Sequence, residues 1–195
     1  MLYNILYAIV RAALSVVYRI NIQGRENIPE GATVVCANHT SNLDPVMVAF
    51  ALGIKTNPAF LAKAELFKNR MFGGLLKAIG AIPVRRGQSD VTAIKNCMKA
   101  LKNGKKLVIF PEGTRNKTGE ELEAKVGAAM FAVKTDSNIL PIYVSPKQKL
   151  FGRIDVFIGK PYKIEHNPGE KLEHEQFKLL AGDIMKHIDA ARECK

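Results

Sequence analysis

The sequence predicts a single α/β domain in which a mixed, mostly parallel sheet is flanked by helices. Apolar runs of four to six residues alternate along the chain with segments of helical periodicity. These runs show no polar–apolar alternation, which is typical of strands covered on both faces of a sheet. A length of 195 residues and a hydrophobic content of 47% allow one domain with a substantial core.

The first twenty residues predict an N-terminal helix that lies in a membrane interface. They are mostly apolar, whereas Asn4, Arg11, Ser15 and Arg19 fall near one narrow stripe of a helix. A bilayer-spanning helix needs about 20 predominantly apolar residues, and Arg11 interrupts the middle of this run. A signal peptide carries positive charge before its apolar segment, yet no Lys or Arg precedes Arg11. We therefore expect residues 1–20 to lie on the membrane with their arginines at the headgroups. The alternative is an ordinary helix packed on the domain.

Residues 21–195 are expected to form the remaining domain. The predicted strands cover residues 33–37, 59–62, 81–84, 107–110, 139–144 and 154–158. The predicted helices cover residues 45–52, 66–79, 91–102, 125–135 and 173–192. Polar clusters follow three of the strands, as "NHTSNLD", "RRGQSD" and "PEGTRN". Because functional residues of α/β folds gather where strands end, these clusters are the candidate site.

Positive charge is concentrated in the middle of the chain. The formal net charge is +11, and residues 55–106 contain twelve basic residues against Glu65 and Asp90, a net charge of +10. This concentration favours an anionic partner such as anionic lipid, a phosphate ester, nucleic acid or an acidic protein.

The three cysteines, Cys36, Cys97 and Cys194, form no CxxC motif. Their odd number favours a reducing compartment and argues against a disulfide framework and a zinc site. Cys36 lies in an apolar run and is expected in the core. No metal and no cofactor are expected.

His39 and Asp44 follow the first predicted strand, residues 33–37. Asp44 precedes Pro45, which suits the first helical position, so Asp44 is expected to be the N-cap of the next helix. If the intervening loop folds back, the carboxylate also accepts a hydrogen bond from the imidazole. That bond fixes the tautomer, and the other ring nitrogen can take a proton from a hydroxyl group. Since the chain has no G-x-S-x-G motif, the hydroxyl is expected to belong to the substrate.

The other two clusters carry groups suited to anion binding. In "FPEGTRN", Arg115 offers a planar fork for phosphate or carboxylate, and Glu112 can accept from a hydroxyl. A turn explains the Pro, Gly and Asn of this cluster but does not need Glu112 and Arg115 together. Arg85 and Arg86 end the apolar segment "GAIPV" and are not expected to be packing residues.

The blocks "NHTSNLD", "GAIPVRR", "PEGTR" and "LPIYV" resemble, in their order and spacing, the four blocks of the glycerolipid acyltransferase family. The resemblance runs from about Gly24 to Val144 and includes the opening "GRENIPEG". It is greatest to the bacterial 1-acylglycerol-3-phosphate acyltransferases, the lysophosphatidic acid acyltransferases. Residues 21–195 would accordingly be an acyltransferase domain.

The resemblance also implies roles for individual residues. His39 would be the base on the glycerol hydroxyl, with Asp44 as its orienting partner, and Pro141 matches a proline linked to the acyl-donor side. Pro83 stands where the second block often has an aromatic residue, which leaves the shape of that loop open. The positions that match acceptor-binding residues are Arg86, Glu112, Gly113, Thr114 and Arg115.

The reaction implied is acyl transfer from an acyl thioester to the free hydroxyl of lysophosphatidic acid, which gives phosphatidic acid. The thioester would be carried by acyl-carrier protein or by coenzyme A. An anionic membrane surface is the third expected partner, and the protein is expected on the cytoplasmic face of the cell membrane, peripheral or monotopic.

Other functions remain open at the level of sequence. Within the family, glycerol-3-phosphate or another lysolipid is an alternative acceptor. A basic, non-catalytic lipid- or nucleic-acid-binding protein is an alternative of another class. The basic stretch lacks interleaved aromatic residues and a known nucleic-acid motif, so no nucleic acid is expected as a partner. Intact His39 and Asp44 argue against a non-catalytic relative.

Overall fold

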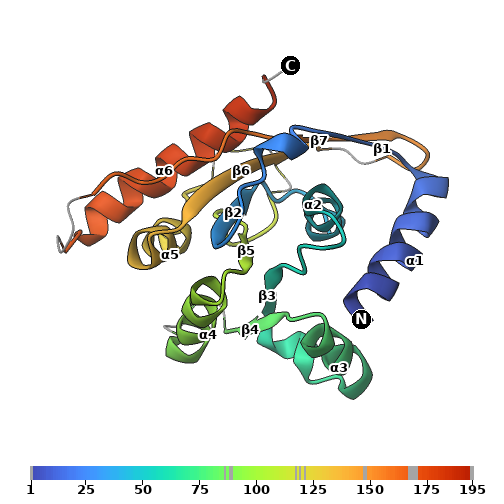
Figure 1. Ribbon diagram of the computed structural model, residues 1–195, viewed down its shortest axis with the longest axis horizontal. Coiled ribbons are helices and arrows are strands. Elements are labelled where there is room, and N and C mark those ends of the chain that lie inside the picture. The colour runs from blue at the N-terminus through green and yellow to red at the C-terminus, as the bar shows by residue number, and fades with distance from the viewer. Residues whose placement is uncertain are drawn as a thin grey trace.

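The computed structural model describes residues 2–85, 87, 90–116, 118, 120, 122–146, 149–166 and 171–193. The strands of these residues form one sheet in the order β1-β7-β6-β2-β5-β3-β4 (Figure 1). Their bounds are β1 (Arg19–Gln23), β2 (Thr33–Ala37), β3 (Ala59–Lys63), β4 (Ile82–Val84), β5 (Lys106–Ile109), β6 (Asn138–Val144) and β7 (Arg153–Ile158). Neighbouring strands run parallel except β6 and β7, which are antiparallel. The predicted mixed, mostly parallel sheet is confirmed.

Helices cover both faces of this sheet. They are α1 (Leu2–Val17), α2 (Asp44–Leu52), α3 (Arg70–Ala78), α4 (Val91–Lys102), α5 (Gly127–Thr135) and α6 (His174–Ala191), with short 3-10 turns η1 (Arg25–Asn27) and η2 (Ala64–Phe67). In Figure 1, α4, α5 and α6 lie on one side of the sheet, and α1 and α2 lie on the other. The domain is therefore a three-layer α/β structure.

Strand β2 shows why the apolar runs do not alternate. Val34 and Cys36 point into the core beneath α4, α5 and α6, whereas Val35 and Ala37 point into the core beneath α2. All four side chains are fully buried, because successive residues of a strand face opposite sides and both sides are covered. The prediction that Cys36 belongs to the core is confirmed.

The N-terminal helix is shorter than predicted. Helix α1 ends at Val17, and Arg19 and Ile20 belong to β1, which pairs with β7 at the edge of the sheet. The sequence prediction missed this strand because β7, the strand with which it pairs, is distant in the sequence. Among the described residues, no helix combines the length and the apolarity needed to cross a bilayer.

Helix α1 also differs from the prediction in the direction of Arg11. The Arg11 guanidinium lies over the Phe50 ring of α2, 5.0 Å from its centroid, instead of pointing away from the domain. Tyr7 packs edge-on against the same ring at 5.2 Å. The prediction that Arg11 reaches the headgroups is therefore wrong: a cation–π contact holds it on the inner face of the helix.

The helix predicted over residues 66–79 is divided in two. η2 covers Ala64–Phe67, and α3 begins only at Arg70. The Asn69 side chain accepts hydrogen bonds from the backbone N–H groups of Met71 and Phe72, so it caps a new helix.

Candidate active site

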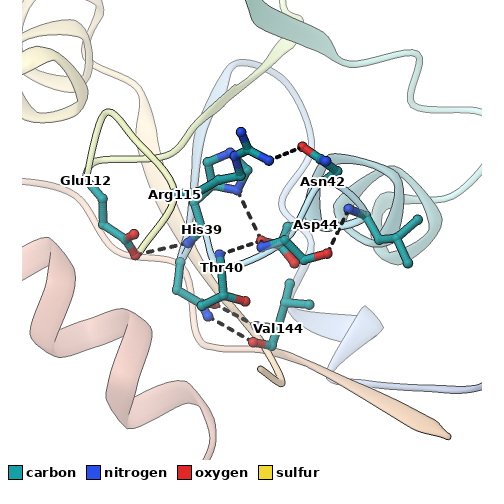
Figure 2. Close-up of polar contacts among 10 residues, drawn as sticks. His39, Thr40, Asn42, Asp44, Glu112, Arg115 and Val144 are labelled. Atoms are coloured by element: carbon teal, nitrogen blue, oxygen red, sulfur yellow. Dashed lines mark hydrogen bonds and ion pairs between the residues drawn. The ribbon is translucent and has the colours of Figure 1, made fainter. Parts of the chain in front are cut away.

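The candidate site lies at the carboxyl-terminal end of the central strands β2, β5 and β6, which we call the edge of the sheet. The loop after β2 carries "NHTSNL" and the loop after β5 carries "PEGTRN". Because β5 and β6 both run parallel to β2, their carboxyl ends reach the same edge. Two predicted clusters that lie far apart in sequence are thereby brought together (Figure 2).

His39 and Asp44 are in direct contact. Nδ1 of His39 lies 3.1 Å from Oδ2 of Asp44, so the prediction that the loop folds back is confirmed. The Asp44 side chain is fully buried, and 11% of the His39 side chain is exposed. A carboxylate on Nδ1 favours the tautomer that carries its proton there, which directs the lone pair of Nε2 away from Asp44.

Asp44 organises the loop that precedes it. Its Oδ2 accepts the backbone N–H groups of Thr40 and Ser41, each at 2.6 Å. The prediction of Asp44 as the N-cap is wrong in detail, because Leu43 is the cap residue and α2 begins at Asp44. The reason is geometric: the loop turns back on the carboxylate and brings its own N–H groups within reach.

Phe110, at the end of β5, packs on the imidazole. Its ring lies 4.3 Å from the His39 ring, centroid to centroid, at an interplanar angle of 27°. This stacked contact and the Asp44 hydrogen bond restrict rotation of the imidazole about both side-chain torsions.

Glu112 joins the two loops. Its Oε1 accepts the backbone N–H of His39 at 2.9 Å (Figure 2). The backbone carbonyl of His39 accepts the N–H of Asn116 at 2.7 Å. Oε2 of Glu112 is buried and has no hydrogen-bond partner among the described residues. Burial raises the pKa of the Glu112 carboxyl, the hydrogen bond from His39 opposes that rise, and the nearby charge of Asp44 adds to it. Glu112 thus holds the His39 backbone, a role that the sequence did not predict.

Arg115 stands at the exposed side of the same edge. Its Nη1 donates a 2.7 Å hydrogen bond to Oδ1 of Asn42, which links the two loops a second time. Gly113 has a positive φ of 69°, and Thr114 is exposed beside Arg115. The turn therefore buries Glu112 and presents Arg115 to solvent.

The remaining predicted positions lie elsewhere or outside the description. Arg86 falls outside the described residues. Its neighbour Arg85 is exposed, and its backbone N–H donates to Asp90. Pro141 is buried within β6, next to Cys36 of β2 in the register, and Pro83 is an exposed residue of β4. Within the ranges that the structure covers, no group of three or more His, Cys, Asp and Glu side chains is placed to hold a metal ion.

Sequence reasoning missed three residues that support the site. Asn38 binds the end of β6 through both amide atoms, donating to the Val144 carbonyl at 2.8 Å and accepting the Val144 N–H at 2.7 Å. Phe110 and Asn42 were the other two. Each of the three lies within or next to a predicted polar cluster, and this position in the sequence was the one signal that could have identified it.

Comparisons with known proteins agree with this geometry. A family model described as "Acyltransferase" matches residues 19–145. A chloroplastic 1-acyl-sn-glycerol-3-phosphate acyltransferase of Arabidopsis thaliana is 34% identical over 158 residues, which cover 74% of this chain and 44% of that protein. An enzyme of the same name from Bacillus subtilis is 33% identical over 151 residues, covering 73% of each chain.

A solved structure shows the same fold. The 1-acyl-sn-glycerophosphate acyltransferase PlsC from Thermotoga maritima has a TM-score of 0.67 and 27% sequence identity, over 90% of this chain and 72% of that one. The chain spans about half the length of the first curated relatives that it matches. The match of the family model across most of the sheet, together with the identity to the Bacillus subtilis protein, shows that this chain belongs to the acyltransferase family.

Proposed function

We propose that the chain transfers an acyl group from an acyl thioester to the free hydroxyl of 1-acylglycerol-3-phosphate, giving phosphatidic acid. The observation that carries this proposal is the buried contact between His39 and Asp44 at the edge of the sheet, beside an exposed arginine. The names of the relatives agree with the acceptor.

The reaction needs one base that later acts as an acid. Nε2 of His39 takes the proton of the acceptor hydroxyl while Asp44 stabilises the imidazolium through Nδ1. The hydroxyl oxygen attacks the thioester carbonyl carbon, a C–O bond forms, and collapse of the tetrahedral intermediate breaks the C–S bond. The imidazolium returns its proton to the leaving sulfur, so a free thiol and an ester are produced. General acid–base catalysis of this kind contributes about 10²–10⁴ in rate.

The acceptor is positioned through its phosphate group. Arg115 is exposed, already oriented by Asn42, and suited to bidentate contact with a phosphate. Arg86, Glu112, Gly113 and Thr114 complete the proposed acceptor site, with Glu112 also holding His39 in place. Fixing the phosphate orients the hydroxyl against Nε2, and orientation can account for much of the lowering of a barrier.

The membrane is the third proposed partner, because the acceptor and the product are lipids. The inner face of α1 packs on α2 through Tyr7 and Arg11, and Tyr3 is buried beside Tyr7, so the outer face of α1 carries the exposed side chains. The large apolar residues exposed on this helix are Leu2, Ile5, Ile9, Val10 and Val16. A helix with this distribution lies in the membrane interface with its apolar face toward the acyl chains. The proposed location is the cytoplasmic face of the cell membrane.

The experiment is a transfer assay with the purified protein. Lysophosphatidic acid, glycerol-3-phosphate and another lysolipid are offered as acceptors, each with acyl-carrier protein and with coenzyme A as the thioester carrier. We expect phosphatidic acid with lysophosphatidic acid only, together with one equivalent of free thiol. Product formation with another acceptor but not with lysophosphatidic acid would contradict the proposed substrate.

Vesicle sedimentation tests the membrane part separately. The protein is expected to bind vesicles rich in anionic lipid more tightly than neutral ones, and salt should reduce the difference. Equal binding to both kinds of vesicle at every salt concentration would contradict an electrostatic contribution from the basic stretch.

A further inference from the structure

Helix α3 exposes its apolar side. Met71 is 85% exposed, Phe72 is 45% exposed and Leu75 is 36% exposed. On a helix these three side chains fall within one sector, whereas Arg70 and Lys77 fall on the opposite side. A surface helix of a soluble domain normally turns its apolar sector toward the core, so the orientation of α3 is reversed.

A glycine fixes this orientation. Gly73 is the buried residue of α3, and a Cβ at this position would lie 2.6 Å from the backbone oxygen of Phe67. The backbone of α3 therefore lies directly against η2 at Gly73, with no room for a side chain between them. Asn69 caps the helix from the same connection. Rotation that would bury Met71 and Phe72 requires the loss of this close contact.

The charges around α3 are positive. α3 contains no acidic residue. From Lys55 to Lys77, Glu65 is the sole acidic residue against five basic ones, and four of these, Lys63, Lys68, Arg70 and Lys77, lie in or near the helix in sequence. Lys63, Lys68, Arg70 and Lys77 are all exposed. Exposed apolar side chains surrounded by basic ones are complementary to an anionic bilayer, in which acyl chains lie beneath negatively charged headgroups.

A second apolar face lies at the same end of the molecule. In Figure 1, α3 and the N-terminal end of α1 both lie at the lower right of the view. The outer face of α1 also exposes large apolar residues, among them Ile5 at 48% and Ile9 at 60%. A bilayer can contact two separate helices at once, whereas a small acidic protein that binds α3 gives no reason for the apolar face of α1.

From these observations we infer that α3 is a second membrane-contacting helix, which inserts Met71, Phe72 and Leu75 into the interface of an anionic bilayer. The inference rests on the membrane association proposed above and does not depend on the acyl-transfer reaction. Such helices bury their apolar face about 5–10 Å into the boundary between headgroups and acyl chains. Arg70 and Lys77 lie on the side of the helix opposite the apolar residues, and their long side chains would reach the headgroup phosphates from there.

The chain has no tryptophan, so a single introduced tryptophan is an unambiguous reporter. The experiment uses the full chain with Met71→Trp and, as the matched control, the full chain with Leu179→Trp. Leu179 is 72% exposed and belongs to α6, a helix that lies away from α1 and α3 in Figure 1. Fluorescence is recorded with vesicles of phosphatidylglycerol, with neutral vesicles of phosphatidylcholine, and with phosphatidylglycerol vesicles whose acyl chains are brominated near the carbonyl end.

With phosphatidylglycerol, the emission of the Met71→Trp protein should shift to shorter wavelength, and the brominated lipid should quench it strongly. The Leu179→Trp protein should show neither change. If both proteins sediment with the vesicles but Met71→Trp is not quenched, α3 does not contact the bilayer and the inference is overturned. If neither protein sediments, the inference falls together with the proposed membrane association, and the transfer assay is unaffected.

Acidic acyl-carrier protein is added in a separate arm of the same experiment. A spectral change of the Met71→Trp protein with the carrier protein, and none with vesicles, would overturn the inference in favour of a protein partner. As a second measurement, Phe72→Ser with Leu75→Ser should weaken vesicle binding by about tenfold or more, because two large apolar side chains no longer leave water. Leu179→Ser should leave binding unchanged. Equal binding by the double variant and the Leu179→Ser variant would count against α3.

Discussion

Two regions of this protein reverse the usual distribution of polarity. At the edge of the sheet, His39, Asp44 and Glu112 are polar and buried. On the outer faces of α1 and α3, Ile9, Val16 and Met71 are apolar and exposed. Burial of polar groups costs free energy unless hydrogen bonds compensate, and contiguous exposed apolar groups mark a surface that meets a partner.

The two regions differ in whether other groups of the chain compensate for this unusual placement. The polar side chains at the end of the sheet are held by hydrogen bonds within the chain. Asp44 accepts from the backbone N–H groups of Thr40 and Ser41 and contacts the His39 ring, and Glu112 accepts from the backbone N–H of His39. The apolar side chains of α1 and α3 project away from the core and meet no comparable set of neighbours. The first region is therefore stabilised by contacts within the chain, whereas the second is the surface that we propose to meet a bilayer. Chemistry and membrane binding should therefore be separable by mutation.

The largest effect is expected at His39. His39→Ala should lower acyl transfer by about 10²–10⁴-fold, because the reaction loses its base, while vesicle binding stays unchanged. The measurements are initial rates and sedimentation, with circular dichroism to show that the protein is folded. His174→Ala, at an exposed histidine on α6, is the control. Undiminished turnover by a folded His39→Ala protein would remove the proposed mechanism.

The opposite separation is expected on α1. The triple variant Ile5→Ser, Ile9→Ser, Val16→Ser should reduce binding to anionic vesicles by about 10²-fold, since three side chains no longer leave water on binding. Activity on a dispersed, short-chain acceptor should persist because the sheet edge is untouched. Deletion of the whole helix is a poorer test, since α1 covers Phe50 through Tyr7 and Arg11. If the triple variant binds vesicles as the unmodified protein does, α1 is structural only.

Asp44→Asn should lower kcat by about 10²-fold with little change in KM. Asparagine preserves the shape of the side chain but removes the charge that stabilises the imidazolium. A merely structural role would instead show as a lower Tm, so thermal unfolding is measured alongside the kinetics. An unchanged kcat in a folded Asp44→Asn protein would contradict the orienting role.

Arg115 tests whether the exposed side of the sheet edge binds the acceptor. Arg115→Ala should raise KM for lysophosphatidic acid by about tenfold or more, because a hydrogen-bonded charge contact is lost. Asn42→Ala should give a smaller rise of the same kind, since Asn42 orients the guanidinium without carrying its charge. A rise in KM for the thioester instead would assign Arg115 to the donor.

The smallest effect concerns Glu112 and pH. Burial raises the pKa of its carboxyl above the ordinary 4.5. The folded protein then binds this proton more tightly than the unfolded chain, so this group lowers stability as pH rises from 4.5 through the raised value. Glu112→Gln keeps an acceptor for the His39 N–H but does not ionise.

The difference in Tm between Glu112→Gln and the unmodified protein should accordingly grow in favour of the variant as pH rises through that window. Thermal unfolding at a series of pH values measures it. A difference that is constant across the window would show that the carboxyl does not titrate differently in the folded protein.

The strands of the central sheet and the polar clusters that follow them could be predicted from the sequence. These features are local: an apolar run of a few residues marks a strand buried on both faces, and a polar residue after it marks the edge of the sheet. The pairing of His39 with Asp44 was also accessible, because the two residues belong to one short loop.

Contacts between segments that are distant in sequence could not be predicted in this way, because they depend on how the whole domain packs. Strand β1 exists because it pairs with β7, Glu112 holds His39 across 73 residues, and Arg11 turns inward because Phe50 lies beneath it. The outward direction of the apolar side of α3 depends on the contact of Gly73 with η2. Periodicity reports which side of a helix is apolar but not which side the domain covers, because that depends on elements packed from elsewhere in the chain.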